Sequence, residues 1–298
     1  MTLLPPDALR GMRLGISVSE STDLGRLGLL EEHFRLALGE IARVVLVSGG
    51  GLAYGGDLRP GGYTEFLEGE LQRYGRRDRP LLVCLAWQEH RKLSLSDLLQ
   101  RRNLGLLGRV VCLDPEGAEI DPAGGRSEAP VLADDPDVRR RALTAMRRYL
   151  GERTDGRVLL GGKRRGFHGE IPGLMEEALL ALVAHQPLYL AGGYGGVTLD
   201  IARILGIADG SWLPPETGAP PADPRFIDGQ ARLTALTRAP NWCGMRNGLS
   251  DHENRTLATS HRPSDIAALI SLGLGRLGLG RQARDRDPDA TSRDAGDP

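Results

Sequence analysis

The sequence is poor in aromatic residues, cysteine and net charge, and each shortage excludes a class of protein. Aromatic residues make up only 4% of the 298 residues, so a hydrophobic core must be built mostly from Leu, Val, Ile and Ala. The three cysteines (Cys84, Cys112 and Cys243) are too few for a disulfide framework and lack the spacing of a metal site, which fits a reducing cytoplasm. The formal net charge of -1 argues against a nucleic-acid binder, which needs a basic excess.

Long apolar runs are also missing. No segment offers the roughly 18 consecutive apolar residues that suggest a membrane span, and the first residues lack an apolar stretch of signal-peptide length. We therefore expect a cytoplasmic protein that does not contact a membrane. The outlier in composition is glycine, whose 41 residues gather in clusters along the chain.

Short apolar runs alternate with helix-length amphipathic segments, which is typical of a layered α/β protein. Strands are expected at 13–18, 52–54, 80–86, 109–113, 157–160 and 187–190. Helices are expected at 29–47, 62–74, 136–150, 172–184, 197–205, 254–260 and 264–279, with a long loop at 114–135.

This order of elements predicts an α/β fold with a doubly wound, Rossmann-like, mostly parallel sheet and a helical C-terminal extension. We assign 1–210 to the sheet domain and 211–280 to the helical extension that packs on it. The last stretch, 281–298, is charged and has no apolar periodicity, so we expect it to be disordered.

Three glycine-rich loops carry the strongest functional signal. They span 55–62, 161–169 and 192–196, and each lies between a predicted strand and a predicted helix. In an open parallel sheet such loops share one edge, where ligands bind, and the following helix presents unpaired N–H groups to an anion. A single glycine cluster is more often a tight turn, but these three recur with Arg59, Lys163, Arg164 and Arg165 nearby. Together they predict a phosphate-bearing, nucleotide-like ligand.

The candidate ligand-binding residues come from these loops and from the small polar loop after the first strand. The loops match neither a P-loop nor a dinucleotide fingerprint, and we expect no cofactor and no metal. The candidates are Ser19, Glu20, Gly55, Gly56, Asp57, Arg59, Gly161, Gly162, Lys163, Arg165, His168, Gly192, Gly193, Gly195 and Thr198. His168 either contacts phosphate, acts as an acid or base near neutral pH, or is simply exposed. Asp200 either binds a ribose or begins a helix.

The order of strand, small polar loop, helix, Tyr54-Gly55-Gly56 and a later strand ending in two glycines resembles the SLOG superfamily, over about 13–205. That group holds the "Lonely Guy" phosphoribohydrolases, DprA/Smf-type DNA-processing proteins, and sensor domains of TRPM channels and bacterial defence systems. In the hydrolases a later strand ends in P-G-G-x-G-T-x-x-E. The resemblance places Glu177 at the catalytic glutamate, and Arg141 or Arg147 at the arginine of the preceding helix.

The match to the hydrolase motif is incomplete. Leu160 stands where the hydrolases have proline, Leu174 where they have threonine, and an insertion at 163–171 changes the phosphate cradle. Glu176 and Glu177 also fit an ordinary first helical turn, where acidic residues complement the helix dipole. The arginines of 139–148 equally fit a solvated helix face.

Two functions remain open from the sequence. The altered motif favours a sensor of an ADP-ribose-like or cyclic-nucleotide signal, as in a bacterial defence or stress system. Such a sensor is expected to act through an effector protein in trans and, like related domains, to form a homo-oligomer. The alternative is a hydrolase of N-glycosidic bonds in nucleotides, with Glu177 and Arg147 as its catalytic residues.

Overall fold

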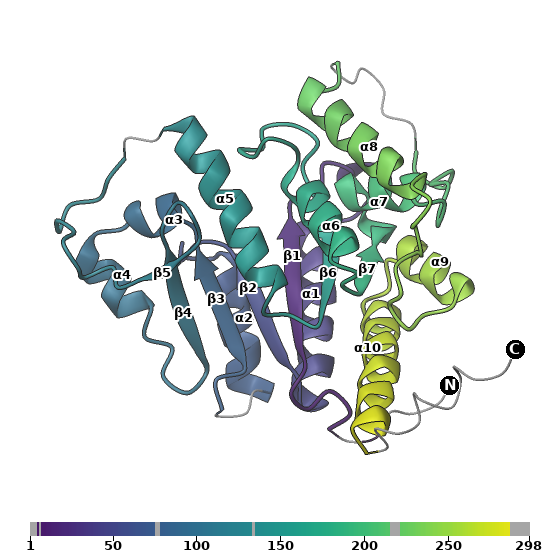
Figure 1. Ribbon diagram of the computed structural model, residues 1–298, viewed down its shortest axis with the longest axis horizontal. Helices are drawn as coiled ribbons and strands as arrows, with labels where there is room; N and C mark the ends of the chain where they lie inside the picture. The colour runs from purple at the N-terminus through teal and green to yellow at the C-terminus, as the bar shows by residue number, and fades with distance from the viewer. Residues whose placement is uncertain (1–4, 6, 75–77, 133–134, 215–220, 287–298) are drawn as a thin grey trace, which may run out of the picture.

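The computed structural model describes residue 5 and residues 7–74, 78–132, 135–214 and 221–286, with side chains to residue 279. Over these residues the chain forms a seven-stranded sheet in the order β5-β4-β3-β2-β1-β6-β7 (Figure 1). The strands are β1 Arg13–Ser19, β2 Gly51–Gly55, β3 Leu81–Leu85, β4 Gly108–Leu113, β5 Glu119–Ile120, β6 Gly156–Gly161 and β7 Leu188–Ala191. Strands β4 and β5 pair antiparallel, and the other neighbours pair in parallel. The predicted α/β, Rossmann-like fold is confirmed.

The helices follow the predicted pattern, with three additions. They are α1 Glu31–Val47, α2 Tyr63–Tyr74, α3 Trp87–Arg91, α4 Leu95–Arg101, α5 Pro136–Gly151, α6 Gly173–Val183, α7 Gly196–Ile204, α8 Pro224–Thr237, α9 Asp251–Thr259 and α10 Pro263–Arg286, with short 3-10 helices η1 Gly25–Leu27 and η2 Gly192–Tyr194. The sequence analysis missed α3, α4 and α8. Helices α3 and α4 are too short to show a helical period of apolar residues. Helix α8 does carry a start signal, a cap at Asp223 followed by proline at the first position, but the surrounding proline-rich segment was taken for a linker.

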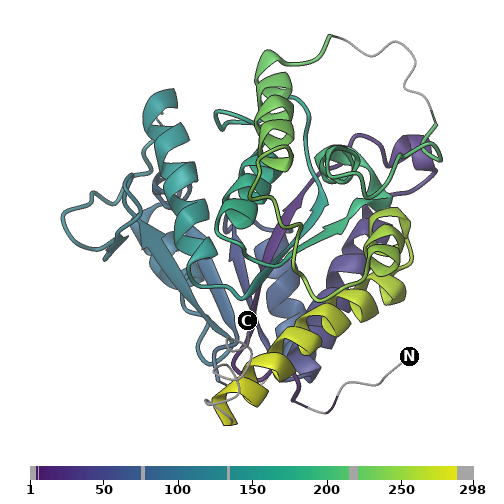
Figure 2. The same cartoon turned by 45° about the vertical axis from the view of Figure 1, so that its right-hand side comes forward.

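The helices cover both faces of the sheet. One face packs against α1, α2 and α10 through a core that includes Leu38, Leu67 and Ile270. The other face packs against α5 through Met146 and Leu150, and against α6 and α7. Figure 2 shows α10 running beside α1, and these two helices are in extensive contact.

The central strand β1 has one apolar face and one polar face. Leu14, Ile16 and Val18 join the core under α1. The alternate positions, including Gly15 and Ser17, face α5 and α6, since neighbouring side chains of a strand point to opposite faces. Strands buried on both faces of a parallel sheet are usually apolar throughout. The polar face of β1 therefore marks a place where the core is interrupted.

The order of the strands reverses at this same position. The chain moves outward from β1 through β2, β3 and β4, and then crosses back to place β6 and β7 on the other side of β1. In open α/β sheets, ligands bind in the crevice at the carboxyl ends of the strands where such a reversal occurs. The fold thus directs attention to the ends of β1 and β6.

The C-terminal helices share the cores of the sheet. Phe226 and Leu233 of α8 join the residues under α6 and α7, and Ile266 of α10 joins those under α1. Helix α10 continues to Arg286, past the expected start of the tail at 281, and 287–298 lie outside the described residues. The division at residue 210 stays a prediction. Within the described part of the chain, no helix has the length and apolar character to cross a membrane.

Candidate functional site

A cluster of charged side chains fills the space over the polar face of β1, between α5 and α6. Arg157 enters it from β6 and is 2% exposed. Its Nη1 donates to Ser17 Oγ at 3.0 Å and to Glu177 Oε2, and the Ser17 hydroxyl donates to the same carboxylate oxygen. A buried charge requires such pairing, because the desolvation of an unpaired ion is costly.

Arg147 of α5 contacts the other oxygen of Glu177. Its Nε lies 3.7 Å from Glu177 Oε1, and its Nη1 pairs with Glu176, which also accepts a hydrogen bond from Thr144. The guanidinium lies against the start of α6, where a Cβ at Gly173 would be only 2.7 Å from Arg147 Nη2. The cluster therefore joins two guanidinium groups to two carboxylates, and a larger residue at the first position of α6 would displace it.

The two arginines that the resemblance proposed lie in different surroundings. Arg147 is buried beside Glu177, whereas Arg141 is exposed and lines a different cavity with Arg148 and Glu116. The sequence analysis offered a solvated helix face as the alternative for the arginines of 139–148. That alternative fits the exposed Arg141 and Arg148, but it does not fit the buried Arg147. The sequence analysis missed Ser17 and Arg157, although two signals pointed to them: the polar alternation of the first strand and a charged residue inside a later one.

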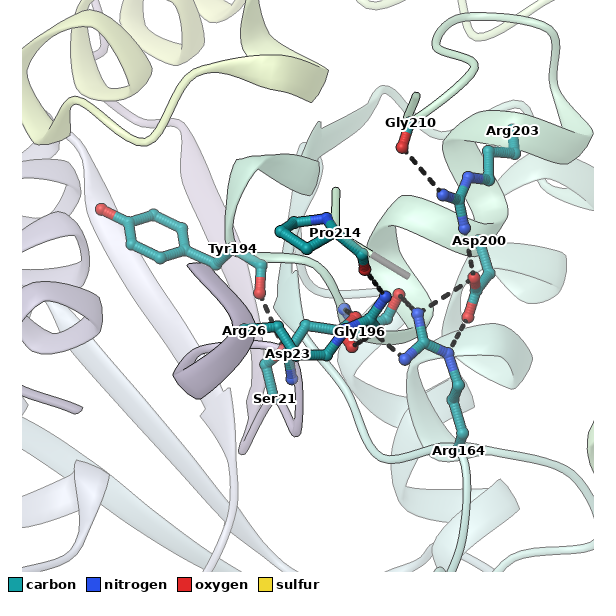
Figure 3. Close-up of polar contacts among 10 residues, drawn as sticks. All are labelled: Ser21, Asp23, Arg26, Arg164, Tyr194, Gly196, Asp200, Arg203, Gly210 and Pro214. Carbon is teal, nitrogen blue, oxygen red and sulfur yellow. Dashed lines mark hydrogen bonds and ion pairs between the residues drawn. The ribbon is translucent and has the colours of Figure 1, made fainter. Parts of the chain in front are cut away.

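A second buried cluster lies at the start of α7 (Figure 3). Asp23 follows β1 and is fully buried. Its Oδ2 accepts the Gly196 N–H at 2.7 Å and pairs with Arg164 at 2.9 Å, and its Oδ1 pairs with Arg26 at 2.6 Å. Burial alone would raise the pKa of Asp23, but the Gly196 hydrogen bond and the two guanidinium groups outweigh it and hold the pKa below 3.8.

Arg164 is held between two carboxylates of the protein. Its Nε lies 2.6 Å from Asp200 Oδ2, and Asp200 also pairs with Arg203. Although burial works against the charge, Asp200 and Asp23 raise the pKa of Arg164 above its usual value. The Asp23 carboxylate thus occupies the anion-binding position at the start of α7. The sequence analysis expected Arg164 to add positive charge to the second glycine loop, but Asp23 and Asp200 neutralise it. Asp200 lies inside α7 as an ion-pair partner, so the expectation that it begins a helix is corrected.

The glycines of the three loops lie close to other parts of the protein. In the third loop, an added Cβ at Gly192 or Gly193 would meet the Ala258 or Ser260 carbonyl at the end of α9. Other glycines of the three loops are equally close to neighbouring residues. An added Cβ would meet Leu150 at Gly55, Tyr54 at Gly56, Ser19 at Gly161, Val197 at Gly162 and Asp23 at Gly195. Glycine at these positions lets neighbouring segments of the chain pack closely together. That these glycines bind a ligand stays a prediction.

The polar candidates lie mostly at the rim of the carboxyl edge. Lys163 pairs with Glu20 at 3.0 Å, and Arg59 pairs with Asp57 at 3.4 Å. All four of these side chains are at least 36% exposed, so these ion pairs are weak and open to exchange with a ligand.

The remaining candidates lie on the loop before α6 and on α7. His168 Nδ1 accepts a hydrogen bond of 2.9 Å from Arg139. Burial, followed by the charges of Arg139 and Lys92, lowers the pKa of His168 below 6.5. Arg165 donates to the Pro221 carbonyl, and the buried Thr198 hydroxyl has no hydrogen-bond partner among the described residues.

The fold and the cluster over β1 define a class: a Rossmann-like α/β protein with a buried cluster of ion pairs where the strand order reverses. A family model described as SLOG cluster2 matches residues 8–257, and the chain belongs to this SLOG family. The resemblance seen in the sequence is thereby confirmed, and membership indicates a nucleotide-related domain. Neither a curated protein nor a solved structure matches the chain. No three His, Cys, Asp or Glu side chains of the described residues are grouped so that they could hold a metal ion.

Proposed function

We propose that this protein binds a phosphate-bearing, nucleotide-derived ligand over β1 and acts as a sensor of it. The observation that carries the proposal is the position of the Ser17, Arg147, Arg157 and Glu177 cluster, which interrupts the core beside the reversal of strand order. Hydroxyl and carboxylate groups are side chains that bind ribose hydroxyls. The guanidinium groups of Arg147 and Arg157 are already paired with Glu176 and Glu177, so we assign the phosphate to the exposed cations at the rim. Family membership supports the same ligand class.

The rim supplies cations that a phosphate can engage. Lys163 follows β6 and Arg59 follows β2, so both lie at the carboxyl edge. Each is paired with an exposed carboxylate, and a phosphate offers the same charge with more acceptor oxygens. Arg164 is excluded from this role because Asp23 and Asp200 already neutralise it.

Contacts at Glu177 favour sensing over hydrolysis. Its Oε2 accepts from Ser17 and Arg157, and its Oε1 faces Arg147. A general base must accept a proton from water, and here either oxygen would first have to give up a contact. The alternative, an N-glycosidic hydrolase, is supported by one observation: Glu177 and Arg147 lie side by side, as the resemblance to the phosphoribohydrolases requires.

The test is a panel of AMP, ADP-ribose, NAD and cyclic nucleotides, with the melting temperature and free base measured on the same samples. A sensor is stabilised by at least one compound, which stays intact. Lys163→Ala and Arg59→Ala should each weaken its binding several-fold. Arg10→Ala, which removes an exposed, paired arginine elsewhere, should leave it unchanged. The proposal fails if no compound raises the melting temperature.

Glu177→Gln separates sensor from hydrolase. If free base is released by the wild type and this variant stops the release while still binding, the hydrolase alternative replaces the sensor. If no base is released by either, sensing stands. The effector in trans and the homo-oligomer stay predictions, which size measurements with and without the stabilising compound would test.

A further inference from the structure

The first part of β4 forms an open edge of the sheet. Strand β5 is the outermost strand, and it pairs only with Cys112 and Leu113 at the carboxyl end of β4. Over 108–111, β4 therefore has a strand partner on one side only, β3, within the described part of the chain. Figure 1 shows β4 near the end of the sheet, with α4 beside it. An edge of this kind offers backbone donors and acceptors to another chain.

A groove of about 460 Å³ runs along this edge. It is lined by each residue from Gly108 to Cys112, by Leu99 of α4 and by the loop after α4. Alternate side chains of a strand point to opposite faces of the sheet, so a cavity that touches consecutive residues lies along the edge of the strand and not over one face. Extended peptides bind to exposed edges by adding a strand.

The backbone groups that face the groove follow from the ladder with β3. The Leu81 N–H donates to the Leu107 carbonyl at 3.2 Å. In a parallel ladder every second residue bonds to a given neighbour, so Arg109 continues the bonds to β3. The N–H and C=O groups of Gly108 and Val110 consequently point away from β3 and toward the groove. Each of these two residues thus offers one donor and one acceptor to an added strand.

The side chains around the groove favour an acidic strand. The described residues that line it include three arginines, Arg79, Arg102 and Arg109, and a single carboxylate, Glu119. Glu119 pairs with Arg109, and Arg102 lies 3.6 Å from Asp121. Arg79 is exposed and has no ion-pair partner among the described residues. An added strand with acidic side chains would therefore complement the charge of the groove.

We propose that β4 binds an extended acidic segment of another protein as an added strand. A second copy of this chain fits the edge less well. An antiparallel pair of β4 edges joined through Gly108 and Val110 is centred on Arg109, and it sets the two Arg109 side chains opposite each other, which is unfavourable for like charges. The proposal concerns a protein partner and does not depend on the ligand over β1.

Synthetic peptides test the charge preference of the groove. The probe is a capped, labelled peptide of about eight residues that alternates glutamate with valine, a strand former. Its fluorescence anisotropy should show saturable binding to the protein. The counterpart with lysine in place of glutamate should bind about tenfold more weakly, because arginines predominate around the groove. If the glutamate peptide does not bind, the proposal is wrong.

N-methylated peptides test whether the bound chain is an added strand. Alternate N–H groups of a strand point to opposite edges. One peptide is methylated at every glutamate nitrogen and the other at every valine nitrogen, so each lacks one set of donors. One of them should bind like the parent, and the other about tenfold more weakly, the loss of about two hydrogen bonds. Equal affinities of the two methylated peptides would rule out strand addition.

Arg79→Gly tests the contribution of the exposed cation. Arg79 has a φ of 58°, which glycine adopts more readily, so the variant should melt no lower than the wild type. It should bind the glutamate peptide about threefold more weakly, as expected for one exposed ion pair. Arg246→Gly is the matched control, since Arg246 is exposed, has a φ of 43° and lies outside the groove. If Arg79→Gly binds as tightly as this control, the acidic partner is excluded.

Amide hydrogen exchange locates the peptide on the protein. In the free protein the amides of Gly108 and Val110 should exchange faster than that of Arg109, which bonds to β3. The glutamate peptide should slow exchange at Gly108 and Val110, and binding without this effect would overturn the proposal. If the peptide does not bind, and both amides are already protected in a protein that sediments as a dimer, a second copy occupies the edge instead.

Discussion

Arg157 and Arg164 show at the residue scale how the interior of this protein holds charge. Arg157 is buried and Arg164 is 16% exposed, and each meets at least one carboxylate from another element of the fold. Paired charges of this kind contribute little net stability, but removing one partner is costly because the other is left buried and unpaired. A ligand at the carboxyl edge must therefore use the exposed cations or exchange with one of these pairs.

Asp23→Asn tests the cluster at the start of α7. The folded-state pKa of Asp23 is lowered, so its stabilisation is complete above the unfolded value of about 3.9 and is lost as the pH falls through the folded pKa. At pH 7 the variant should lose about 3 kcal/mol of unfolding free energy, because Arg164 and Arg26 lose a buried partner. Thermal melts from pH 7 to pH 2 measure both effects.

Below pH 4 the wild type should lose stability more steeply than the Asp23→Asn variant. Asp251→Asn, an exposed aspartate in α9, is the control and should keep the wild-type slope. Parallel acid slopes for wild type and Asp23→Asn would show that the Asp23 carboxylate does not stabilise the fold.

The boundaries of several elements follow from short signals. Helix α5 begins where Asp135 caps the backbone and Pro136 occupies the first position, and α9 begins at the Ser250 and Glu253 capping box. Such signals act within one turn, so the sequence predicts α5 closely. Contacts between distant elements leave no comparable local pattern in the sequence. The sequence therefore did not predict that the end of α9 packs against η2.

Gly193→Ala tests that approach. A Cβ at this position would overlap the Ser260 carbonyl and force α9 and α10 away from η2. We expect a loss of about 1–3 kcal/mol, as for other overpacked sites. Gly69→Ala in α2 is the matched control: its Cβ would meet nothing within 4 Å, and the change should add about 0.5–1 kcal/mol. Urea unfolding measures both, and equal midpoints for Gly193→Ala and wild type would contradict the contact.

At the scale of the whole molecule, the C-terminal helices and the sheet form shared cores. Ile266, Ile270 and Leu274 of α10 are almost fully buried and belong to the core that holds β1 and α1. The extension therefore completes the sheet face that α1 and α2 cover only in part. Unfolding of α10 would expose that core, so we expect the sheet and the extension to unfold together.

Leu274→Ala tests this coupling. The side chain is 1% exposed, and its truncation should cost about 2–5 kcal/mol. Leu279→Ala on the same helix, at a side chain 41% exposed, should change the unfolding free energy by less than about 0.5 kcal/mol. In Leu274→Ala, circular dichroism and tryptophan fluorescence should shift to the same new midpoint. Separate midpoints would mean that the sheet unfolds independently of α10.

The sequence by itself determined the class of fold, the places of the main strands and helices, and the family. It also placed Glu177 and Arg147 in one candidate site. These properties rest on periodicity, capping and motif order, which act over a few residues or along one element. That Arg147 and not Arg141 meets Glu177 depends on how α5 rotates against α6, and only packing sets this.

The tertiary structure alone decided which charged side chains are buried in ion pairs and which lie in exposed ones. Ser17 meets Glu177 across 160 positions of sequence, and Arg164 meets Asp23 from a separate loop. Such pairs form because the strand order brings β1 and β6 together, and no local pattern encodes that order. Packing of distant elements therefore decides which side chains remain for a ligand.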